Sequence, residues 1–146
     1  MQMITPDELV YPVLSISKDS YLRVHIRPES LKTANALALR RQYFKEMVVI
    51  DAEGRTYEVT SVLDRVPANR WWGLQFMQPR LFRVNLAMAE RTPLPLSKVK
   101  ARVTSAIKQD LELWDADGEV DARLSRIRSA STLREVMSSL QWNTSQ

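Results

Sequence analysis

The chain contains a single histidine, His25, and no cysteine. A catalytic histidine needs a nucleophile to activate and a group that orients its ring, and zinc sites usually combine several histidine or cysteine ligands. The chain has no second histidine, and no nucleophile or carboxylate lies at a spacing from His25 that indicates a catalytic relay or a metal site. On an alternating strand, His25 would point to the same side as Arg23 and Arg27, so we expect a solvent-facing or interface side chain. No metal and no cofactor is predicted.

Carboxylates are the other groups that could perform acid or base chemistry. Several of them fall on two expected neighbouring strands and their turn: Glu46, Asp51, Glu53, Glu58 and Asp64. Paired carboxylates can act as general acid and base. These positions, however, alternate with apolar ones, which is typical of the solvent-exposed face of a strand. The three glycines are isolated, so no glycine-rich phosphate loop is present. We therefore expect no catalytic site and a protein that is not an enzyme, with a small hydrolase as the third hypothesis.

The strongest local charge imbalance is an acidic segment, residues 110–121, which contains no lysine or arginine. Placing Gly118 at the glycine position of a calcium-binding loop would put Leu113 first and Leu124 twelfth, where aspartate and glutamate are required. A turn that ends a helix explains the same residues. The segment is thus a candidate surface for a basic partner. Its candidate binding residues are Asp110, Glu112, Asp115, Asp117 and Glu119.

A second candidate surface lies on the predicted strands. Trp71 and Trp72 are adjacent, so on a strand they face opposite ways, and we assign Trp72 to the core. Trp71 is then either covered by a carboxyl-terminal helix or exposed as an interface anchor, a role in which tryptophan and arginine are favoured. The candidate residues of this surface are Arg23, His25, Arg27 and Trp71.

The pattern of apolar residues predicts an α+β domain that spans residues 1–146. Alternation over 13–17 and 21–27 indicates a first hairpin, and a helix is expected over 31–45. Further strands over 47–50, 57–63, 71–77 and 82–88 complete an antiparallel meander. Helical spacing over 96–114, 120–127 and 132–140 then predicts a carboxyl-terminal group of two to three helices.

Composition and charge limit the cellular setting. The chain has 146 residues, 45% hydrophobic and 26% charged, with a formal net charge of +4. No apolar run is long enough to cross a bilayer, and the first ten residues lack the features of a signal peptide, so we expect a cytoplasmic protein without a membrane partner. Residues 1–45 hold seven basic against four acidic side chains. A nucleic-acid-binding regulator that uses this basic amino-terminal surface is the alternative hypothesis.

The order of the predicted elements resembles that of small bacterial immunity proteins, which neutralise a cognate toxin in polymorphic or contact-dependent inhibition systems. The resemblance covers the meander, the helix over 96–114, the Asp117-Gly118 turn and the two helices that follow. It implies a noncatalytic protein that binds a toxin domain and covers its active site or blocks its docking. Immunity proteins against nucleases are often acidic, and the net charge of +4 departs from that pattern. Partner identity, strand order and oligomeric state are left open.

Overall fold

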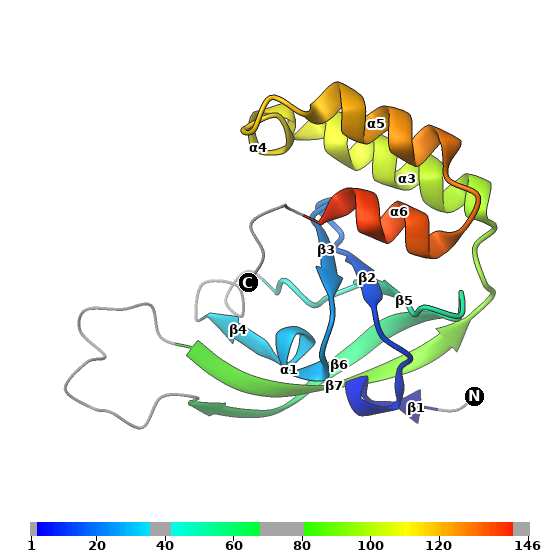
Figure 1. Cartoon of the computed structure of the whole chain (residues 1–146). Helices are drawn as coiled ribbons and strands as arrows, with labels where there is room; N and C mark the ends of the chain where they lie inside the picture. The colour runs from blue at the N-terminus through cyan, green and yellow to red at the C-terminus, as the bar shows by residue number, and fades with distance from the viewer. Residues whose placement is uncertain (1–2, 36–41, 68–80, 142–146) are drawn as a thin grey trace.

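The computed structural model describes residues 3–35, 42–67 and 81–141. They form an antiparallel, curled sheet with a layer of helices against one side, so the predicted α+β class is confirmed (Figure 1). The strand order is β1-β7-β6-β5-β2-β3, and β4 also pairs with β7. The predicted strand over 71–77, with Trp71 and Trp72, lies outside the described residues.

The first hairpin forms where the alternation predicted it. Strands β2 (Val13–Ile16) and β3 (Leu22–His25) pair antiparallel, with Val13 opposite His25 and Ile16 opposite Leu22. The other edge of β2 pairs with β5 (Val48–Ile50). All four residues of β2 are buried, so this strand has protein against both of its faces.

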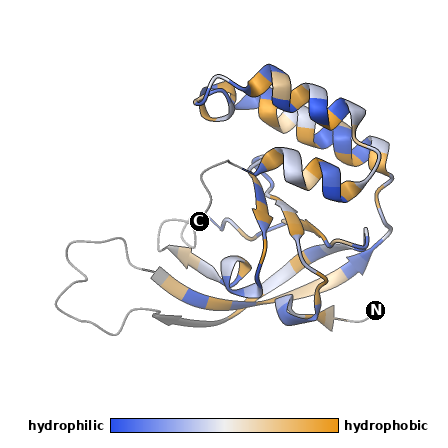
Figure 2. Cartoon of the chain, viewed as in Figure 1, coloured by the Kyte–Doolittle hydropathy of each residue, from blue (hydrophilic) through white to orange (hydrophobic). Residues whose placement is uncertain are grey.

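The remaining large strands form a true meander. Strand β5 returns through a tight turn into β6 (Thr56–Pro67), which pairs along most of its length with β7 (Leu81–Arg91). Val84, Leu86 and Met88 are buried, whereas Arg83 is exposed, as the alternation over 82–88 predicts. Figure 2 shows this alternation of hydrophobic and hydrophilic positions along β7.

The predicted helix over 31–45 is wrong in the part that the structure describes. Helix α1 (Pro28–Leu31) has a single turn and is followed directly by β4 (Thr33–Asn35), which pairs with β7. Ala34 is buried in the sheet core, and this burial outweighs the weak helical spacing of the sequence. Residues 36–41, which include Arg40 and Arg41, lie outside the described part.

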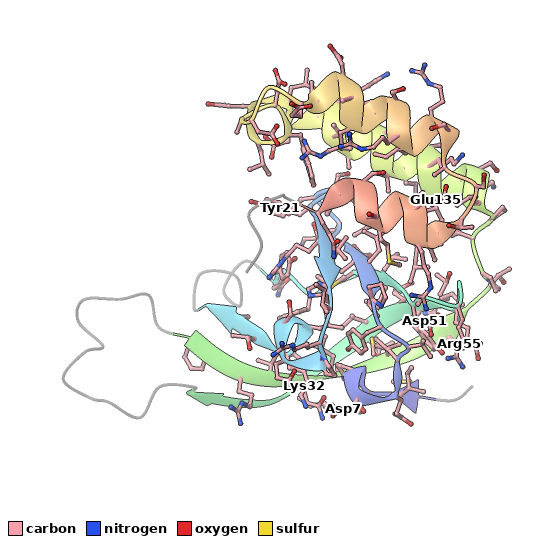
Figure 3. All side chains as sticks on the ribbon, in the orientation of Figure 1. Asp7, Tyr21, Lys32, Asp51, Arg55 and Glu135 are labelled. Carbon is pink, nitrogen blue, oxygen red and sulfur yellow. The ribbon has the colours of Figure 1, made fainter. Side chains whose placement is uncertain are left out.

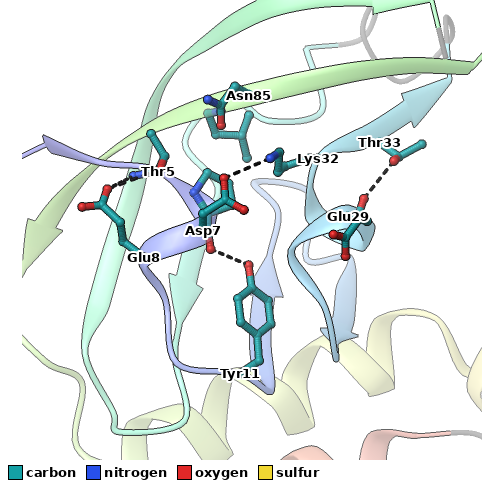
Figure 4. Close-up of polar contacts among 10 residues, drawn as sticks. Thr5, Asp7, Glu8, Tyr11, Glu29, Lys32, Thr33 and Asn85 are labelled. Carbon is teal, nitrogen blue, oxygen red and sulfur yellow. Dashed lines mark hydrogen bonds and ion pairs between the residues drawn. The ribbon is translucent and has the colours of Figure 1, made fainter.

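The amino terminus closes the sheet beside α1. Strand β1 (Met3–Ile4) pairs with β7, and the short 3-10 helix η1 (Pro6–Glu8) follows Thr5, whose backbone amide donates to the Glu8 carboxylate at 2.8 Å. Lys32 after α1 pairs with Asp7 of η1 at 3.0 Å (Figure 4). This exposed pair links two segments that are distant in the sequence.

The sheet has a separate hydrophobic core on each face. One core joins Leu14 and Ile16 of β2 to the helical layer, and the other gathers Val13, Val49 and Met88 inside the curl of the sheet. Neighbouring residues of β2 therefore serve different cores, because successive side chains of a strand point to opposite faces.

Four helices make up the helical layer: α3 (Leu96–Gln109), α4 (Leu111–Trp114), α5 (Val120–Ser129) and α6 (Leu133–Leu140). The single helix predicted over 96–114 is interrupted at Asp110, whose φ of −139° and ψ of 57° are not helical. Helix α6 lies between the α3–α5 pair and the sheet (Figure 1). At its start, Thr132 Oγ1 accepts from the Glu135 amide at 3.2 Å, and the Glu135 carboxylate accepts from the Ser131 amide at 2.7 Å. None of the helices in the described ranges has the length and apolar character that a membrane span needs.

Candidate functional site

His25 is buried, which corrects the expected solvent-facing orientation. Only 2% of the residue is exposed, whereas the next residue, Ile26, which the same alternation would place on the core side, is 64% exposed. The expectation assumed one dry face for the hairpin, but β3 has a covered face on each side near His25. The side chain of His25 therefore cannot serve as a contact residue on an outer surface.

Two serines hold the imidazole of His25. Its Nε2 lies 2.9 Å from Ser15 Oγ, and its Nδ1 lies 2.8 Å from Ser30 Oγ. Hydroxyls can donate or accept, so a neutral ring satisfies both contacts in either tautomer. Burial, assisted by the nearby guanidinium of Arg23, lowers the pKa of His25 from 6.5 to about 3. The ring is thus neutral at physiological pH.

The Ser15–His25 pair has the distance of a nucleophile and its general base. However, Ser15 is 0% exposed, and burial keeps its hydroxyl from any substrate in solution. The arrangement in this conformation satisfies buried polar groups and fixes the β2–β3 hairpin to α1. Arg23 and Arg27 are exposed whereas His25 is buried, so these three candidate residues do not share one accessible surface. Trp71 lies outside the described residues.

The carboxylates of the hydrolase hypothesis are largely occupied by structural contacts. Asp51 is fully buried at the β5–β6 turn, where Oδ1 accepts from the amides of Glu53 and Arg55 and Oδ2 accepts from Arg55 Nε, each at 3.0 Å (Figure 3). Glu58 pairs with Arg91 at 3.3 Å. Within the described ranges, no group of three or more histidine or acidic side chains could hold a metal ion.

The acidic segment, residues 110–121, is displayed at one end of the helical layer. It contains α4 and the turn that leads into α5 (Figure 1). Asp110 is partly buried, and the carboxylates of the other acidic residues are on exposed positions: Glu112, Asp115, Asp117, Glu119 and Asp121. Four of the five predicted candidate residues of this segment are therefore exposed to a partner.

A buried arginine holds the acidic segment in place. The Arg123 residue is 2% exposed, and its guanidinium donates to the Trp114 carbonyl at 3.0 Å and to Asp117 Oδ2 at 3.2 Å. It also donates to the Ser139 carbonyl at 3.1 Å and lies 5.7 Å from the centre of the Trp114 ring. The hydrogen bond from Arg123 is the main cause that lowers the pKa of Asp117. Arg123 of α5 thus ties the acidic segment to α6.

Two acidic residues of the segment also shape its backbone. Asp115 Oδ1 accepts from the Val120 amide at 3.2 Å, and Asp117 Oδ1 accepts from the Glu119 amide at 3.1 Å. Gly118 has a φ of +74°, a conformation that glycine adopts without strain. Asp115 and Asp117 are therefore structural as well as exposed, and no hydrogen bond among the described residues occupies the carboxylates of Glu112 and Glu119.

Exposed leucines accompany the carboxylates. Leu111 is 48% exposed and Leu113 is 39% exposed, whereas Trp114 on the same short helix is buried. Apolar side chains surrounded by charged ones are typical of a protein–protein contact surface. The sequence analysis missed both leucines and Arg123. The spacing of Val120, Arg123 and Ile127 at i, i+3 and i+7 could have placed Arg123 on the buried face of α5.

Comparison with models of known protein families, with curated proteins and with solved structures gives no match. The candidate site therefore stands on its geometry. It combines accessible carboxylates, two exposed leucines and a backbone fixed by Arg123.

Proposed function

We propose that this chain is a noncatalytic, cytoplasmic protein-binding domain that acts as an immunity protein and neutralises a cognate bacterial toxin. The observation that carries the proposal is the acidic segment, where Leu111 and Leu113 are exposed among carboxylates. A partner that fits it has a basic surface around an apolar pocket. Binding would cover the active site of the toxin or block its docking.

The fixed backbone of the acidic segment supports this proposal. A surface that is ordered before binding loses less conformational entropy when the partner arrives. The contacts of Arg123 with Trp114 and Asp117 provide that order. Carboxylates around the apolar side chains would speed the encounter with a basic partner and make its rate depend on salt.

The test is capture of a partner from a lysate of the native cell after nuclease treatment. The acidic variant Glu112→Ala/Glu119→Ala/Asp121→Ala leaves Asp115 and Asp117 in place, so it removes charge without cutting the backbone contacts. A matched control, Asp19→Ala/Glu29→Ala/Glu90→Ala, removes the same number of exposed carboxylates elsewhere.

We expect the wild type and the control to retain the same basic protein, and the acidic variant to lose most of it. Leu111→Ser/Leu113→Ser should lower the affinity of that protein by about tenfold or more, which corresponds to about 1.4 kcal/mol. Co-expression should protect cells from the captured protein if it is toxic. Equal retention by all variants, or a captured protein without toxicity, would contradict the proposal.

A further inference from the structure

A groove on the outer surface of the helical layer is separate from the acidic segment's exposed leucines. It encloses about 630 Å³ between α3 and the end of α5. The α3 residues that line it lie on the face opposite Val99, Val103 and Ile107, which enter the core. The groove therefore opens to solvent on the side of α3 that faces away from the core.

The charge of this groove has one sign. Lys100, Lys108 and Arg128 line it, and no carboxylate does so. Helix α3 contains four basic residues and no acidic one, and Lys108 and Arg128 form no ion pair with any carboxylate of the described residues. Cations gathered without counter-charges attract a polyanion.

The basic side chains of the groove are arranged along the axis of α3. Lys100, Thr104 and Lys108 occur at every fourth residue of α3, so they follow one face of the helix over roughly 12 Å. Lys100 Nζ donates to the Arg128 carbonyl at 3.0 Å, which links the two helices and fixes the width of the groove. Hydroxyl and amide side chains complete the lining, namely Ser97, Thr104, Ser105 and Gln109.

These side chains match a phosphate backbone better than other polyanions. Lysine, arginine, serine, threonine and glutamine are the usual donors to phosphate oxygens. The lining has no aromatic ring on which an unpaired base could stack, and Leu124 is its single large apolar side chain. A membrane surface or an acidic protein would need more apolar contact area than this lining offers.

We propose that the groove between α3 and α5 binds the phosphate backbone of double-stranded nucleic acid without reading its sequence. This site differs from the basic amino-terminal surface expected from the sequence. The chemistry is shared by duplex DNA and duplex RNA, so both are tested. The proposal is independent of the partner bound by the acidic segment.

The experiment measures fluorescence anisotropy of labelled duplex DNA and duplex RNA of mixed sequence, titrated with the full chain at several salt concentrations. If the three groove cations neutralise three phosphates, affinity falls roughly 40-fold between 50 and 200 mM salt. The variant Lys108→Ala/Arg128→Ala should bind more weakly at every salt concentration, and its affinity should fall only about fourfold over the same range. Lys100 is left unchanged because it links α3 to α5.

The control Lys18→Ala/Arg27→Ala removes two exposed cations of the amino-terminal surface and should behave as the wild type. Circular dichroism confirms that each variant is folded. A tighter complex with one duplex identifies DNA or RNA as the source of the phosphate. Absence of binding at 25 mM salt, equal loss in the two variants, or loss confined to the control would overturn the proposal. Binding to phosphatidylserine vesicles but not to either duplex would overturn it in favour of a membrane.

Discussion

Protonation of His25 should destabilise the folded protein in mildly acidic solution. The folded state keeps the imidazole neutral, with a pKa of about 3, because the ring is buried between Ser15 and Ser30. The unfolded chain exposes the ring and binds a proton with the ordinary pKa of 6.5. Stability is therefore complete above pH 6.5 and is lost as the pH falls from there toward 3.

The size of the effect follows from this difference in proton binding. For pKa values of 6.5 unfolded and about 3 folded, the free energy of unfolding at pH 5.5 is about 1.4 kcal/mol lower than at pH 7.5. At pH 5.0 the loss grows to about 2 kcal/mol. Ordinary carboxylates begin to bind protons mainly below pH 5, so the interval from pH 7.5 to 5.5 isolates the histidine.

Urea unfolding at pH 7.5, 6.5 and 5.5 measures this slope. The variant His25→Asn cannot bind a proton at this position, so its unfolding free energy should change far less over the interval, whatever its stability at pH 7.5. A second measurement does not depend on the variant being folded. The chain has one histidine, so the Cε1–H signal of the imidazole in the wild type needs no assignment.

That signal should stay constant between pH 7.5 and 5 while the protein remains folded. A midpoint near pH 6.5 in the folded protein would contradict a buried, neutral imidazole, because the ring would then accept a proton without unfolding. An equal pH slope in the wild type and His25→Asn would refute it as well, since another group would then carry the effect.

Two further predictions concern buried polar contacts. Asp51→Ala leaves the Glu53 and Arg55 amides without their acceptor, so urea unfolding should show a loss of about 2–3 kcal/mol in the free energy of unfolding. The control Glu53→Ala removes the exposed partner of Arg55 and should cost under about 1 kcal/mol. Similar losses in both variants would contradict a stabilising role of Asp51 in the turn. Arg123→Met should lower the unfolding free energy by about 2–4 kcal/mol and speed proteolysis within the acidic segment, because it removes the contacts with Trp114 and Asp117. The control Arg126→Met, at an exposed position of the same helix, should change neither quantity. Unchanged proteolysis of Arg123→Met would show that the segment is ordered without the arginine.

The sequence predicted elements best where one face is apolar and the other polar. Strand β7 is such a case, because Val84 and Leu86 are buried while Arg83 is exposed. The same logic failed for β3, where His25 is buried between Ser15 of the neighbouring strand and Ser30 of α1. Which residues meet on the second face depends on the order of the strands, and alternation along one strand carries no information about that order.

The candidate site was predicted in part. The absence of lysine and arginine from residues 110–121 placed their carboxylates on a surface, and the structure agrees for Glu112 and Glu119. Helix α3 ends at the break at Asp110, before the apolar spacing does, and Leu111 is exposed in the short helix that follows. Helical spacing alone treated Trp114 as a continuation of α3, although it belongs to a separate short helix.

Strand β2 lies between the two hydrophobic cores of the domain, and each core packs against one of its faces. Leu14 and Ile16 support the helical layer, and Val13 supports the interior of the curled sheet. Displacing β2 would open both cores at once, so neither half of the fold can detach as an independent unit of unfolding. The chain should consequently lose its structure in one cooperative step. Any partner surface on the helices would then unfold together with the sheet beneath it, so a change that destabilises the sheet also lowers the population of the binding-competent surface.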